Sequence, residues 1–181
     1  METEQKLRAL ARIASKLNAA GIVWDVGASL LLYLHGITDE FHDIDLMVRQ
    51  EDADDAAEIL DRLGTRSVPK APDPKYHTKR FLEYVIDGVD VDVMIDMIIV
   101  KDGNEYDCSL KQEEIDGYAE VFGQRIPLHS VAKWKEYYTL MGRDQKASMI
   151  EQADCLLKKR AGRRQRSEIM RSAVRSQRCE G

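Results

Sequence analysis

Two β-rich runs joined by a two-residue link constrain the fold of this chain most strongly. The runs cover residues 81–86 and 89–95, and Asp87-Gly88 lies between them. An Asp-Gly pair between such runs is a strong signal of a β-hairpin, because a two-residue turn favours these two residue types. The sequence therefore predicts an antiparallel strand pair near the middle of the chain.

Hydrophobic periodicity predicts the elements on both sides of this hairpin. Apolar residues at helical spacing indicate helices over residues 2–20, 28–35, 51–63, 130–140 and 146–160. Short apolar or alternating runs indicate strands over residues 22–26 and 43–48, a continuation of the sheet over 97–100 and a second hairpin over 118–128. Three prolines predict a loop over residues 65–78. These elements predict an α/β (α+β) fold, in which a mixed sheet is flanked by helices and followed by a C-terminal helical segment.

The order of the elements and the charge distribution together give three expected parts: a domain over residues 1–128, a helical segment over 129–161 and a mobile basic tail over 162–181. Residues 158–181 hold nine Lys or Arg and two Glu, a balance of +7, so residues 1–157 carry −12 of the net charge of −5. Such a tail offers contacts to RNA phosphates. It contains no aromatic residue, so it offers no base stacking.

Composition excludes several classes of protein. Apolar residues make up 44% of the chain, which is too much for a disordered protein. No apolar run reaches the roughly 18 residues of a membrane span, and the acidic, polar start does not resemble a secretory signal. Cys108, Cys155 and Cys179 are scattered without a Cys-x-x-Cys pair, which argues for reduced thiols in a cytoplasm.

Paired aspartates carry the main chemical signal. Asp43 and Asp45 alternate with apolar residues, so both side chains project from one face of a strand. Carboxylates in this arrangement can hold one or two Mg²⁺ ions, which in turn bridge nucleotide phosphates. Asp90 and Asp92 share a face of the later hairpin strand, and a neighbouring position in the sheet would bring one of them to the same ions. The residues alone leave this choice open.

A glycine turn upstream of the paired aspartates suggests a phosphate site. Gly27 lies between the strand predicted over 22–26 and the helix predicted over 28–35. Backbone N–H groups at such a helix start can hold phosphate.

Strand, glycine and helix, then Asp-Ile-Asp-Leu at 43–46, then a hairpin that ends in Val-Asp-Val at 91–93, resemble the DNA polymerase β-type nucleotidyltransferase superfamily. Residues 27–48 look closest to its minimal prokaryotic members, which include aminoglycoside and lincosamide nucleotidyltransferases and the nucleotidyltransferases of toxin–antitoxin pairs. The resemblance implies a polymerase β-like fold and a nucleotidyltransferase domain over residues 1–128. It also implies two Mg²⁺ ions and attack on the α-phosphate of an NTP, with pyrophosphate leaving.

The family pattern implies a role for individual residues. It selects Asp92 as the third metal ligand beside Asp43 and Asp45, with Asp90 as the alternative. It places Gly27, Ser29 and Lys146 at the nucleotide; Ser29 stands one residue later than the usual Ser, and the basic and acidic residues after Gly142 are reordered. Trp134, Tyr137 and Tyr138 are expected in the core rather than at a base.

Two functions follow as expectations. The first is a cytoplasmic, Mg²⁺-dependent and ATP- or other NTP-binding nucleotidyltransferase that transfers an NMP to an acceptor hydroxyl of a small molecule, protein or tRNA. The second is a catalytically silent binding partner with the same fold, such as a toxin–antitoxin component, which the altered glycine motif favours. The sequence leaves the acceptor, the NTP and the oligomeric state open.

Overall fold

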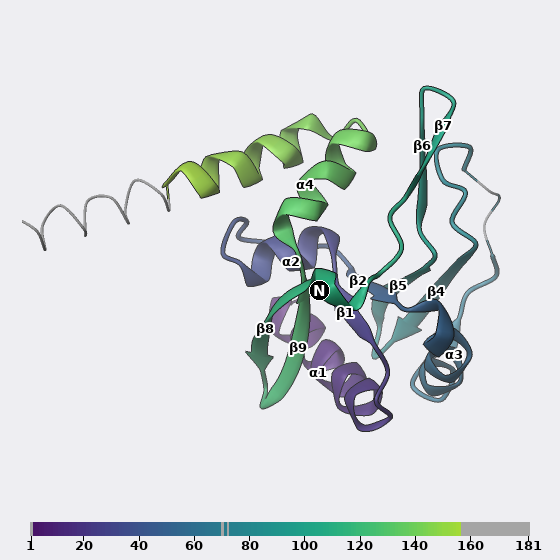
Figure 1. Cartoon of the computed structure of the whole chain (residues 1–181). Helices are drawn as coiled ribbons and strands as arrows, with labels where there is room; N and C mark the ends of the chain where they lie inside the picture. Colours follow the sequence, from purple (N-terminus) through teal and green to yellow (C-terminus); the bar gives the residue numbers. More distant parts are fainter. Residues whose placement is uncertain (1, 70, 72, 157–181) are drawn as a thin grey trace, which may run out of the picture.

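A computed structural model describes residues 2–69, 71 and 73–156 of the chain (Figure 1). The predicted basic tail and residues 157–161 of the predicted helical segment lie outside these ranges. Within the described ranges, none of the helices combines the length and the apolarity that a bilayer crossing requires.

A seven-stranded mixed sheet lies at the centre, in the order β3-β4-β5-β2-β1-β9-β8. Its strands are β1 (Trp24–Val26), β2 (Ile44–Val48), β3 (Thr65–Arg66), β4 (Arg80–Ile86), β5 (Val89–Ile95), β8 (Ile115–Val121) and β9 (Gln124–His129). β2 is parallel to β5 and β1 is parallel to β9, whereas the other neighbours are antiparallel. The predicted mixed sheet is therefore confirmed.

Both predicted hairpins are present. β4 and β5 are joined by Asp87 and Gly88, with φ angles of 53° and 77°. β8 and β9 are joined by Phe122 and Gly123, with φ angles of 48° and 73°. Two successive positive φ angles give a turn whose twist matches that of the flanking strands, which is why Asp-Gly is so favoured there.

Two short segments differ from the predictions. β6 (Ile98–Lys101) does not continue the main sheet but pairs with β7 (Asn104–Asp107) in a separate two-stranded sheet. Asp96, with a φ angle of 51°, lies just before β6 and interrupts the extended backbone of β5. Residues 65 and 66 of the predicted loop form β3, which pairs with β4.

Helices cover both sides of the sheet (Figure 1). They are α1 (Thr3–Ala19), α2 (Ala28–Leu34), α3 (Ala53–Asp61), α4 (Val131–Leu140), a helix over residues 144–156, and the short 3₁₀ helices η1 (Gln50–Asp52) and η2 (Gln112–Glu114). α1 packs against β5, β8, β9 and α3, whereas α4 lies on the opposite side, against α2 and β6.

The core follows the predicted periodicity. Leu10, Ile13 and Leu17 of α1 are fully buried on one stripe of the helix. Burial of each such side chain contributes about 1.5–3 kcal/mol, so this stripe fixes α1 on the sheet. The aromatic residues predicted in the core of α4 are also buried, namely Trp134, Tyr137 and Tyr138.

Candidate active site

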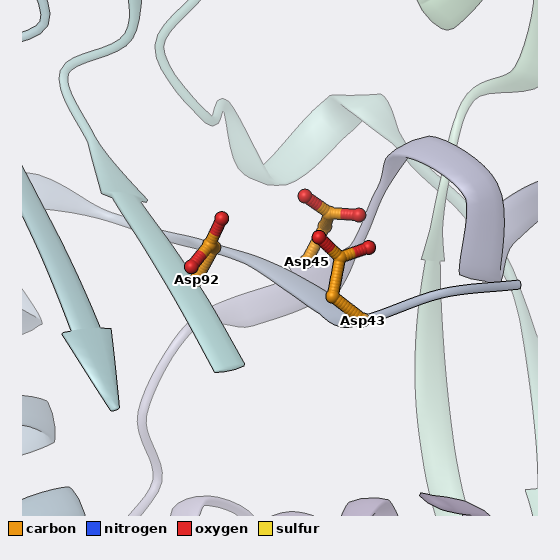
Figure 2. A group of neighbouring side chains, drawn as sticks. All are labelled: Asp43, Asp45 and Asp92. Atoms are coloured by element: carbon orange, nitrogen blue, oxygen red, sulfur yellow. The ribbon is translucent and has the colours of Figure 1, made fainter. Parts of the chain in front are cut away.

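Three aspartates converge on one face of the sheet (Figure 2). Asp45 lies on β2, Asp43 immediately precedes that strand, and Asp92 lies on the neighbouring β5. One carboxylate oxygen of each aspartate lies within 4.8 Å of those of the other two, and all three side chains are half-buried. We call Asp43, Asp45 and Asp92 the acidic triad.

The register between β2 and β5 selects Asp92 over Asp90. The two strands are parallel, and Asp45 is directly beside Asp92. Asp90 lies two residues nearer the hairpin turn, which is about 7 Å along the strand, and it is exposed. In the sheet, Asp92 is therefore the neighbour of Asp45, and Asp90 is not.

The three carboxyl groups of the triad lie close together in a half-buried site. Burial raises the pKa of Asp45 well above its usual range, and the charges of Asp43 and Asp92 raise this pKa further. Arg143 lowers it, but by less than the other causes raise it. A site of this kind favours a bound cation, because a cation relieves both the repulsion and the desolvation.

The turn at Gly27 is tied to the triad through the backbone. The N–H of Gly27 donates a hydrogen bond of 3.0 Å to the carbonyl oxygen of Asp45. A Cβ atom at Gly27 would lie 2.0 Å from a ring carbon of Trp134, so only glycine fits under this indole. Ala28 has a φ angle of 46°, and an alanine in this left-handed region costs on the order of 1–2 kcal/mol. Ser29, half-buried, follows in the first turn of α2.

Among the described residues, Arg143 is the basic residue whose charge acts on the pKa of Asp45. Arg143 follows the positive-φ residue Gly142 at the end of α4, and its charge opposes the rise in pKa that burial causes at both Asp45 and Tyr138. Lys146 is half-buried one turn further along, on the helix over residues 144–156. The Gly-Arg dipeptide at 142–143 was the sequence signal that could have identified Arg143.

A second polar cluster lies beside the triad on the same sheet face, and the sequence analysis did not identify it. Asp25 is directly opposite Met47, which is two residues after Asp45 on β2. The side chains of Asp25 and His129 are both fully buried, and Nδ1 of His129 lies 2.7 Å from Oδ2 of Asp25. A charged residue inside the apolar run 22–26 was the available signal.

The cavity lined by Arg49, Lys79 and Asp96 lies away from the triad. It has a volume of about 530 Å³ and lies at the opposite ends of β2 and β5. Lys79 forms an ion pair with Asp96 at 3.0 Å, and Arg49 forms one with Asp52 at 2.9 Å, so both basic side chains are paired with carboxylates. None of the three aspartates of the triad lines this cavity.

Comparisons with a family model and with solved structures both point to nucleotidyltransferases. The family model described as aminoglycoside-2''-adenylyltransferase matches residues 9–155. A structure of a candidate nucleotidyltransferase from Thermotoga maritima is similar over 84% of this chain and 94% of that one, with 28% sequence identity and a TM-score of 0.67. No curated protein matches.

A second solved structure supports the fold. ANT(2'')-Ia in complex with adenylyl-2''-tobramycin is similar over 88% of this chain and 97% of that one, with 16% identity and a TM-score of 0.55. The family match covers most of the chain, including every residue of the triad and the Gly27 turn. The chain therefore belongs to the aminoglycoside-2''-adenylyltransferase family, and it is a nucleotidyltransferase of the DNA polymerase β-type superfamily.

Proposed function

We propose that this protein transfers an NMP from an NTP to an acceptor hydroxyl in a Mg²⁺-dependent reaction that releases pyrophosphate. The observation that carries this proposal is the convergence of three carboxylates within 4.8 Å on one sheet face. Family membership supports nucleotidyl transfer in general, and we assign the reaction to the acidic triad.

The donor set of the triad fits Mg²⁺. Carboxylate oxygens are the ligands that this hard cation prefers, and Asp43, Asp45 and Asp92 offer three of them on adjacent positions. Burial raises the pKa of Asp45, the charges of Asp43 and Asp92 raise it further, and a divalent cation would counter both causes. We expect two ions, which when bound would neutralise charge on the phosphates and polarise the reacting oxygens.

Residues around the triad have distinct proposed roles. Gly27 and Ser29 hold the nucleotide through the turn that is hydrogen-bonded to the strand of Asp45. Lys146 and Arg143 approach the triphosphate from the helical segment. Asp92 comes from a different strand than the other two acids, so we assign it the additional role of base toward the acceptor hydroxyl.

The favoured acceptor is a small hydroxylated molecule, and the favoured nucleotide is ATP. This choice rests on the family description, which names an adenylyl transfer to an aminoglycoside. A protein side chain or a tRNA end remains the competing acceptor. The fully buried aromatic side chains of α4 are part of the core, so they offer no exposed platform for a nucleic-acid base.

The decisive experiment supplies each labelled NTP with Mg²⁺, an aminoglycoside panel and the small-molecule, protein and RNA fractions of a cell extract. We expect label from ATP to appear on small molecules, and the Asp45→Asn variant to transfer none. Binding of ATP and GTP is measured in parallel by calorimetry, with and without Mg²⁺. If neither nucleotide binds at millimolar concentration, the silent binding partner replaces the enzyme as the preferred function.

A further inference from the structure

The buried pair of Asp25 and His129 lies where α4 joins the sheet. Asp25 is on β1, His129 is the last residue of β9, and α4 begins two residues later at Val131. Nδ1 of His129 lies 2.7 Å from Asp25, and its Nε2 lies 3.9 Å from Oε2 of Glu114 on η2. The imidazole is therefore held between carboxylates from two different elements.

The imidazole of His129 also contacts the inner face of α4. Its ring centroid is 6.2 Å from that of Trp134, in an edge-to-face arrangement, and 5.7 Å from that of Tyr137. Trp134 in turn packs directly on Gly27, where no side chain fits. The indole of Trp134 therefore lies between His129 and the turn that precedes α2.

The far end of α4 lies at the triad. Burial raises the pKa of Tyr138, and the charges of Asp45 and Asp43 raise it further. Arg143 follows this helix after a tight turn, in which its N–H bonds to the carbonyl of Tyr138 at 2.8 Å. A helix of ten residues spans about 15 Å. α4 therefore connects the buried pair at one end to the catalytic carboxylates at the other.

We propose that Asp25 and His129 are positioning residues for nucleotidyl transfer, which fix α4 so that Trp134 closes the Gly27 turn and Arg143 meets the triphosphate. This inference rests on the proposed nucleotide site. It assigns the pair no contact with substrate and no part in the chemical step. Its effect is on the geometry in which Mg²⁺ and nucleotide are bound.

Stability alone is a poor explanation for this pair. Two buried ionisable groups lose their hydration, and replacing such a pair with apolar residues of similar size is often neutral or stabilising. Oδ1 of Asp25 and Nε2 of His129 have no hydrogen-bond partner among the described residues, which adds to the cost. A directional hydrogen bond, in contrast, fixes one orientation of the imidazole against Trp134 and Tyr137.

The test compares four variants by calorimetry with Mg²⁺ and either ATP or GTP. Asp25→Leu removes the hydrogen bond, and the double variant Asp25→Leu/His129→Leu removes both polar groups. Asp25→Asn keeps an acceptor for Nδ1 of His129. Val89→Ala is the control, because Val89 is buried in β5 on the face away from the triad and lowers stability without touching α4.

We expect the two Leu variants to bind nucleotide between about tenfold and 100-fold more weakly, since small displacements of positioning groups have effects of this size. Asp25→Asn and Val89→Ala should bind like the wild type. The proposal is overturned if a Leu variant binds like the wild type, or if affinity follows melting temperature across all variants including Val89→Ala. Should the double variant not fold, the comparison of Asp25→Asn with Asp25→Leu decides.

Hydrogen exchange separates this inference from the proposed function. If the wild type binds neither nucleotide, the proposed function fails, but the placement of α4 is still measurable. We expect α4 amides to exchange at least about tenfold faster in Asp25→Leu, because local opening then costs less, and at the wild-type rate in Val89→Ala. Equal α4 exchange in Asp25→Leu and the wild type would overturn the positioning role.

Discussion

Asp45 and Asp25 lie on the same sheet face of neighbouring strands, yet their charges are compensated differently. Burial raises the pKa of both carboxyls, to about 6 for Asp25. The strongest opposing influence on Asp25 is the hydrogen bond from His129, which lies inside the same core. Asp45 has two further carboxylates beside it, and among the described residues the exposed Arg143 is the cation that opposes the rise in its pKa.

This difference separates a carboxylate that is paired inside the core from a carboxylate that lies among like charges. A carboxylate with a partner inside the protein has its charge compensated within the fold and requires no bound cation. A carboxylate surrounded by like charges destabilises the isolated fold, and such frustration is typical of a site that binds a ligand. The two regions should therefore respond in opposite directions when the carboxylate is removed.

The largest effect is expected on catalysis. Asp45→Asn should reduce nucleotidyl transfer about a thousandfold or more, because a lost metal ligand removes several kcal/mol of transition-state stabilisation. Pyrophosphate release from ATP with Mg²⁺ and an aminoglycoside measures this loss. Asp90→Asn is the matched control, since Asp90 is exposed and lies on the same strand as Asp92. An equal loss in Asp90→Asn would contradict the assignment of the triad.

The next effect concerns the buried pair. Asp25→Ala should lower the free energy of unfolding by about 3–5 kcal/mol, because it leaves His129 buried without its partner. Urea denaturation followed by circular dichroism measures the change. A loss below about 1 kcal/mol, the ordinary value for a point substitution, would show that His129 finds another partner.

The pH dependence of the free energy of unfolding should report the raised pKa of Asp25 in the buried pair. The pKa of Asp25 is raised to about 6 in the folded protein, from an ordinary value of 3.8. The folded state therefore binds this proton more tightly, and the stabilisation is lost as the pH rises through 6. Between pH 7 and pH 5, the wild type should gain about 1 kcal/mol relative to Asp25→Asn. His129, Glu114 and Tyr137 face the same carboxylate, so only this difference between variants isolates Asp25.

The smallest expected effect is on the stability of Asp45→Asn, and it tests the contrast between Asp45 and Asp25 most directly. In the presence of EDTA, Asp45→Asn should raise the free energy of unfolding by about 1 kcal/mol, because it removes a repelled and partly desolvated charge. Thermal unfolding measures this gain, and Asp90→Asn should change stability by less than about 0.5 kcal/mol. A destabilised Asp45→Asn protein would mean that the triad is already compensated within the fold.

Local sequence rules account for the hairpins and for part of the site. Asp87-Gly88 specified its turn because few residue pairs accept two successive positive φ angles. The same dipeptide at 102–103 joins β6 to β7, with φ angles of 52° and 75°, although that hairpin was not predicted. Alternation along 43–48 placed Asp43 and Asp45 on one face.

Long-range packing decided the remainder. The residues alone left Asp90 and Asp92 equivalent, and only the parallel register of β2 and β5 made Asp92 the neighbour of Asp45. The turn at Gly142 brought Arg143 close enough to the triad for its charge to oppose the rise in the pKa of Asp45.

By itself, the sequence determined most of the helices, the two predicted hairpins, and which face of β2 is acidic. These properties depend on φ/ψ preferences and on side-chain periodicity over a few residues. Only the tertiary structure joined Asp25 to His129 across 104 positions of the chain and closed Trp134 over Gly27. Such contacts depend on strand order, register and the packing of a whole helix, and no local pattern encodes these.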